Sequence, residues 1–147
     1  MPASVSVPSI LEAARQQFLT QDKELLLARA HERTITFRFG YYLQQGLPPG
    51  WKVDCEYNRH GLTPKDVKRF PGETKGIFPD ILIHVRGTDE HNLVAIEAKP
   101  KWASKTRKED DRVKLRRLKQ FPYGYAHTYL LMYSDRPEPQ LWLEEIT

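Results

Sequence analysis

Hydrophobic residues recur near every 3.6 positions in the first third of the chain and alternate with polar residues in its middle. The run GLPPG ends the first helical stretch, because proline cannot continue a helix. The patterns predict helices over 8–20, 22–45 and 105–120. Strands are predicted over 51–58, 78–85, 93–100, 128–134 and 140–146. After the N-terminal helix, the predicted order is therefore helix, three strands, helix and two strands.

Two apolar runs, FPDILIHV and LVAIEAKP, are separated by the polar segment RGTDEHN and are predicted to pair as a hairpin. If residues 87–90 form a four-residue turn, the turn fixes every opposed pair. The isoleucines and valines of both runs then share one face. The other face places Asp80 directly opposite Glu97, with Lys99 two residues further along on the same side. A slip of one residue would bury charges among the isoleucines, so the alternation favours this register.

The facing carboxylates of Asp80 and Glu97 suggest a cation site. Like charges directly opposite on a sheet are unfavourable by roughly 0.2–1 kcal/mol. Carboxylates together with backbone carbonyls suit Mg²⁺ or Mn²⁺, and the carbonyl of Ala98 is a further candidate ligand. Lys99 beside such an ion could orient or help deprotonate a water, or stabilise developing phosphoryl charge. The alternative is a Glu97–Lys99 pair on an exposed strand end, which would contribute almost nothing.

Glu32 gives a second indication of such a site. It falls in the middle of the apolar stripe of the helix predicted over 22–45. An unpaired buried carboxylate costs several kcal/mol, so Glu32 requires either a basic partner or a metal. We expect it to join the acidic residues of the hairpin.

The charge distribution suggests a polyanionic partner. The net charge is +4, and the stretch 99–119 holds ten lysines and arginines against three acidic residues. The alternative is a solvated helix face. On the helix over 105–120, Asp111 shares the core-facing stripe of two leucines, and no polar residue of this helix is assigned to the site. The candidate nucleic-acid contacts are Arg59, Lys65, Lys68, Arg69, Lys101, Lys105, Arg107, Lys108, Arg112, Arg116 and Lys119.

An acidic residue on a first helix, then PD at 79–80, then EAK at 97–99, resembles the PD-(D/E)XK nuclease superfamily. The resemblance covers about residues 22–134. It implies an α/β fold with a restriction endonuclease-like αβββαβ core, in which helices flank a central mixed sheet. It also implies Mg²⁺-dependent hydrolysis of phosphodiester bonds. The implied roles are metal ligation by Asp80, Glu97, Ala98 and Glu32, and catalysis by Asp80, Glu97, Lys99 and Glu32.

Length and composition limit the remaining possibilities. The 147 residues suit a single domain, with a helical extension over 1–21 and a basic loop insertion over 60–78. We expect a cytoplasmic protein, because one cysteine cannot form an internal disulfide and no apolar run could cross a membrane. The expected function is a nuclease with little base specificity that acts on DNA in preference to RNA and can form a homodimer. The alternative is a non-catalytic nucleic-acid-binding or assembly protein of the same fold.

Overall fold

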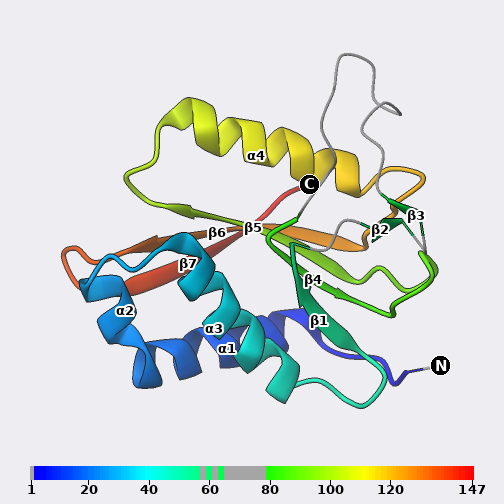
Figure 1. Cartoon of the computed structure of the whole chain (residues 1–147), viewed down its shortest axis with the longest axis horizontal. Helices are drawn as coiled ribbons and strands as arrows, with labels where there is room; N and C mark the ends of the chain where they lie inside the picture. The colour runs from blue at the N-terminus through cyan, green and yellow to red at the C-terminus, as the bar shows by residue number, and fades with distance from the viewer. Residues whose placement is uncertain (1, 57–58, 61–62, 65–78) are drawn as a thin grey trace.

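The computed structural model describes residues 2–56, 59–60, 63–64 and 79–147, so most of the predicted basic loop lies outside it. A mixed sheet has the strand order β1-β4-β5-β6-β7, and only the β5–β6 pair is parallel. The strands are β1 (Lys52–Cys55), β4 (Ile81–His84), β5 (Val94–Pro100), β6 (His127–Ser134) and β7 (Gln140–Glu145). Helices cover both faces of the sheet (Figure 1). The chain is therefore an α/β protein, as predicted.

Helix α1 (Val7–Gln21) and helix α3 (Glu32–Gln45) cover one face of the sheet (Figure 1). Apolar residues of α1, among them Leu11 and Phe18, lie in the same buried cluster as Ile35 and Phe39 of α3. Because their spacing puts them on one stripe of each helix, both helices bury a continuous face against the sheet. The N-terminal helical segment thus contributes buried residues to the core.

The single helix predicted over 22–45 is wrong in its first half. A short helix α2 (Lys23–Leu27) ends, and the chain turns before α3 begins at Glu32. Arg29 takes a left-handed backbone conformation with φ of 50°, which an α-helix cannot include. His31 then caps α3, its Nδ1 accepting a hydrogen bond of 3.1 Å from the backbone N–H of Arg33. Apolar spacing continues across this break because α2 and α3 each bury residues on the same side.

The predicted hairpin register is confirmed. Ile81 lies opposite Ile96, and Ile83 lies opposite Val94. These four side chains point into the cluster beneath α1 and α3. The alternate positions, including Leu82, face a second cluster under helix α4 (Lys105–Leu118). The face that carries Asp80 and Glu97 is therefore the face that α4 covers.

Two further strands, β2 (Arg59–His60) and β3 (Thr63–Pro64), pair with each other in a separate antiparallel sheet. The backbone of the expected loop therefore contains a short paired segment near its start. In the part of the chain that the structure describes, no helix is both long and apolar enough to cross a membrane.

Candidate functional site

The site begins with two carboxylates at the end of the β4–β5 hairpin. Asp80 directly precedes β4, and Glu97 lies in β5, so the observed register brings them opposite each other. The Oδ2 atom of Asp80 accepts a hydrogen bond of 2.7 Å from the backbone N–H of Ala98, which fixes the carboxylate across the two strands. Glu97 is only 2% exposed. An exposed Glu97–Lys99 pair, the alternative considered from the sequence, is therefore not what the chain forms.

Burial disfavours the ionised form of the Glu97 side chain. Burial and the neighbouring charge of Asp80 raise its pKa well above the ordinary value of 4.5, and the Lys114 ammonium opposes them. A hydrogen bond between the carboxyl groups of Glu97 and Asp80 also raises the pKa of Glu97, because one of the two groups must keep its proton to donate it. Lys114 Nζ lies 2.6 Å from Glu97 Oε1. The geometry of this contact is that of an ion pair only, since Oε1 is a buried oxygen without a hydrogen bond.

Helix α4 supplies two residues whose roles were not predicted. Its leucines Leu115 and Leu118 pack on the sheet, and Asp111 lies one turn before Leu115, on the same side. Asp111 Oδ2 consequently reaches Lys99 Nζ at 2.9 Å, and each of these side chains is 13% exposed. Lys114 comes one turn after Asp111 and contacts Glu97. The available signal was a carboxylate on a leucine stripe, the same kind of signal that identified Glu32.

The Lys99–Asp111 pair determines the charge state of the lysine. Burial disfavours the ammonium, but the hydrogen bond and the charge of Asp111 outweigh it, so the pKa of Lys99 is raised. Burial raises the pKa of Asp111 in spite of the opposing lysine. Lys99 is therefore an ammonium at neutral pH. Its Nζ also lies 3.4 Å from the carbonyl oxygen of Ala98, the expected backbone ligand.

Glu32 joins the site from a position other than the expected one. It is the first residue of α3, half-buried, and not the middle of a longer helix. Burial raises its pKa, Asp80 adds to the increase, and Lys99 opposes it. These effects place Glu32 within electrostatic reach of the strand carboxylates.

The site holds more acidic than basic side chains. Among the described residues, four carboxylates and the two lysines in ion-pair contact with them carry a net charge of −2 when all six groups are ionised. The carboxylates are Glu32, Asp80, Glu97 and Asp111, and the lysines are Lys99 and Lys114. In the described ranges, no three acidic, imidazole or thiol groups already converge as a ligand set. Nevertheless, the donors suit a hard divalent cation, because Glu97 Oε1 is a buried carboxylate oxygen without a hydrogen bond.

Four of the candidate nucleic-acid contacts on α4 are occupied by contacts within the chain. Arg112 makes two hydrogen bonds to Glu144, of 2.8 and 2.9 Å. Arg116 pairs with Glu109 at 3.2 Å. Lys108 donates to the carbonyl of Lys101, and Lys119 donates to that of Ile146. These four positions therefore make a weaker anion-binding surface than their spacing alone suggests.

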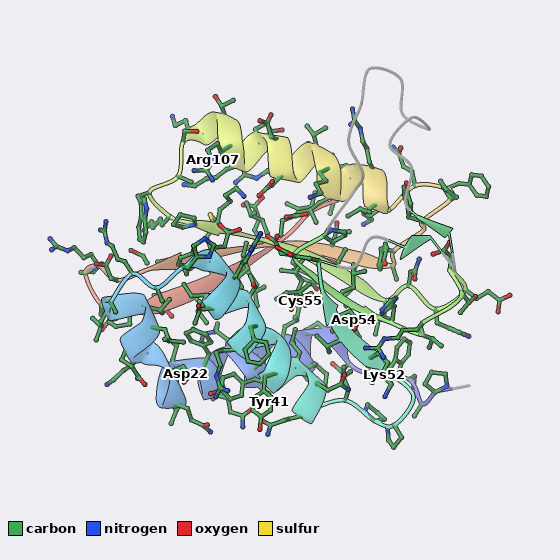
Figure 2. The ribbon with its side chains drawn as sticks, viewed as in Figure 1. Asp22, Tyr41, Lys52, Asp54, Cys55 and Arg107 are labelled. Atoms are coloured by element: carbon green, nitrogen blue, oxygen red, sulfur yellow. The ribbon has the colours of Figure 1, made fainter. Side chains whose placement is uncertain are left out.

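Lys105 and Arg107 are exposed residues of the first turn of α4, and Figure 2 labels Arg107 on that helix. The positive charge of Arg107 lowers the pKa of Glu32 and so opposes the effect of burial. Lys101 is exposed, and its ammonium lies 4.6 Å from the centre of the Trp142 ring. Of the remaining candidates, Lys65, Lys68 and Arg69 lie outside the described residues, as does the side chain of Arg59.

Beside the site, Cys55 differs from its predicted environment. The alternation of β1 predicts a core-facing cysteine, but Cys55 is exposed. Figure 2 shows it on β1 beside α3. Protein atoms still crowd the thiol, whose Sγ lies 3.9 Å from the carbonyl of Thr36. Burial of the thiol, followed by the charges of Asp80 and Asp54, raises the pKa of Cys55 to about 11.

The function of the chain is inferred from the side chains of the site and from the fold that positions them. The chain was compared with protein-family models, with curated proteins and with solved structures, and none of them matches it.

Proposed function

We propose that this chain is a metal-dependent nuclease of the PD-(D/E)XK type that hydrolyses phosphodiester bonds, in DNA in preference to RNA. One observation carries the proposal. The buried carboxylate of Glu97 lies opposite Asp80 on paired strands, and Lys99 is next on the same face. The element order α3-β1-β4-β5-α4-β6 supports it, because it follows the αβββαβ order of a restriction endonuclease-like core.

Asp80 and Glu97 would hold Mg²⁺ or Mn²⁺, with the Ala98 carbonyl and Glu32 as further candidate ligands. A divalent cation would balance the excess of two negative charges and allow every carboxylate to ionise. When bound, the ion would supply Lewis-acid polarisation of the phosphodiester and a more acidic water. The hydrogen bond from Ala98 N–H keeps Asp80 in place across the strands.

Lys99 would stabilise charge and would not act as a general base. Its raised pKa keeps it protonated near neutral pH, so it cannot accept a proton from water. A fixed ammonium suits the negative charge that develops on a phosphoryl group during hydrolysis. Asp111 positions that ammonium through the 2.9 Å contact. Among the roles open from the sequence, the electrostatic one is therefore favoured.

Exposed basic groups at the start of α4 would hold the substrate backbone next to the carboxylates. Arg107, whose charge reaches Glu32, is the best placed, with Lys105 on the same turn and Lys101 on the connection from β5. Contacts to phosphates position a nucleic acid without reading its sequence, so weak base specificity is expected. A double-strand cut by one small domain would require two copies, which makes a homodimer part of this proposal.

A second candidate is a nucleic-acid-binding or assembly protein of the same fold that does not cleave. The observation in its favour is that Lys114 and Lys99 already contact Glu97 and Asp111 at 2.6 and 2.9 Å. A site that needs no metal to neutralise its acids could be a structural ion-pair cluster. It predicts DNA binding that depends on salt and is unchanged by Asp80→Ala.

A cleavage assay separates the two candidates. Supercoiled plasmid, linear duplex, single-stranded DNA and RNA would each be incubated with Mg²⁺, Mn²⁺ or EDTA. We expect metal-dependent cutting that is lost in Lys99→Ala and kept in Lys23→Ala, which removes an exposed lysine of α2. If the folded protein leaves every substrate intact with either metal, the nuclease proposal fails and the binding protein replaces it.

A further inference from the structure

Lys114 approaches the buried acid from the rim of the site. Its side chain is 30% exposed, whereas that of Glu97 is 3% exposed. Nζ lies 2.6 Å from Glu97 Oε1. The contact is therefore an ion pair between a partly exposed lysine and a buried acid. A long flexible stem with one end near solvent can leave such a contact without unfolding the helix.

The two lysines of the site differ in how firmly they are held. Lys99 and Asp111 are equally buried, at 13% exposure, and their charged groups lie 2.9 Å apart. The side chain of Lys114 is more exposed, at 30%, although its Nζ lies 2.6 Å from Glu97 Oε1. Helix α4 thus supplies an acid that fixes Lys99 and, one turn later, a base that covers Glu97. Of the two ammonium groups, that of Lys114 is the more exposed to solvent and can therefore move more readily.

We propose that Lys114 is a built-in competitor of the divalent cation for Glu97, so that metal loading displaces the ammonium from the carboxylate. This inference rests on the proposed function, because it concerns the regulation of the same site. One carboxylate oxygen cannot keep a close ammonium and also bind a metal at full strength, since the two cations repel each other. Lys114 therefore weakens metal binding while it stabilises the metal-free protein.

Competition of this kind couples metal binding to substrate binding. A phosphodiester backbone bound across the carboxylates offers Lys114 another anion, and a lysine drawn to phosphate leaves Glu97 free. The substrate would then raise the affinity for metal, and by reciprocity the metal would raise the affinity for substrate. The enzyme would carry less metal without nucleic acid than with it.

The test is calorimetric titration of Mn²⁺, without nucleic acid, into the full chain and into Lys114→Met. We expect the variant to bind Mn²⁺ about tenfold more tightly, a coupling of ordinary size for competing sites. Lys114→Gln also removes the charge and keeps a polar head group, so it replaces the methionine variant if that variant does not fold. Lys23→Met removes the same charge from the exposed surface of α2 and should leave the affinity unchanged.

The outcomes separate this inference from the proposed function. Equal or weaker Mn²⁺ binding by both Lys114 variants, beside a wild type that does bind, overturns the competition and leaves the nuclease proposal intact. No binding by any of the proteins overturns the metal site and the competition together. Thermal melting gives an independent readout. In EDTA, Lys114→Met should melt lower than wild type, and Mn²⁺ should raise its melting temperature by more.

Discussion

Replacing the buried acid by its amide should stabilise the metal-free protein and abolish the nuclease activity that we propose. Glu97→Gln keeps the shape of the side chain and removes the charge that burial and Asp80 disfavour. The direction of the effect follows from linkage. Because the folded-state pKa of Glu97 is raised, the folded protein holds a proton that the unfolded chain has released. The wild type therefore loses stability as the pH rises from the ordinary value of 4.5 towards the raised pKa.

The size of the effect is set by the pH interval. A single group that is protonated when folded and ionised when unfolded lowers the free energy of unfolding by about 1.4 kcal/mol per pH unit. The amide does not titrate and avoids this loss. The difference between Glu97→Gln and wild type should thus be small near pH 4 and reach about 1–3 kcal/mol by pH 7. The partly exposed Lys114 limits the gain, because its ammonium loses its carboxylate partner in the variant.

Urea unfolding at half-unit pH steps, in EDTA, measures this difference directly. Glu138→Gln is the matched control, since it makes the same substitution at an exposed position between β6 and β7. Saturating Mg²⁺ should raise the stability of the wild type and leave that of Glu97→Gln unchanged. A difference between variant and wild type that stays constant from pH 4 to pH 8 would refute the view that Glu97 is a strained buried acid.

Three further predictions concern the neighbours of Glu97. Asp111→Ala should lower the free energy of unfolding by roughly 1–3 kcal/mol in urea titrations, because Lys99 loses its partner. For the same reason it should reduce plasmid cutting by about a hundredfold. Full cutting activity in the variant would show that Asp111 does not belong to the site. Cys55 should react with iodoacetamide along a pH profile centred at about 11, and Asp80→Asn should shift the profile down; a midpoint near the ordinary value of 9.0 would contradict the effect of burial and of the neighbouring charges. Lys105→Ala should flatten the salt dependence of DNA binding more than Arg112→Ala, since Arg112 is engaged by Glu144; the reverse order would show that the ion pair opens on binding.

The hairpin at the centre of the site could be read from the sequence. Alternation of apolar and polar residues is a local property with a period of two, so it fixes which residues share a face. The short polar connection then fixed the register, and Ile81 does lie opposite Ile96. The meeting of Asp80 with Glu97 follows from that register. These features depend on residues within about twenty positions of one another, where sequence patterns are most informative.

The break before α3 was not predicted, although it decides where Glu32 lies. Apolar spacing continues from Leu26 to Ile35, and the pattern gives no sign that Arg29 takes a left-handed conformation. No glycine or proline marks the turn. A helix boundary set by packing and by a histidine cap therefore escaped a prediction based on periodicity.

Only the tertiary structure decided which charges pair. The spacing of α4 placed Asp111 beside the leucines, but its contact with Lys99 requires that the helix lie across the end of β5. The engagement of Arg112 by Glu144 likewise joins segments far apart in the chain. Ion pairs form wherever packing brings long side chains together, and the sequence does not encode that distance locally. The sequence by itself thus determined the acidic hairpin, whereas the packing of α4 decided which lysine faces each acid.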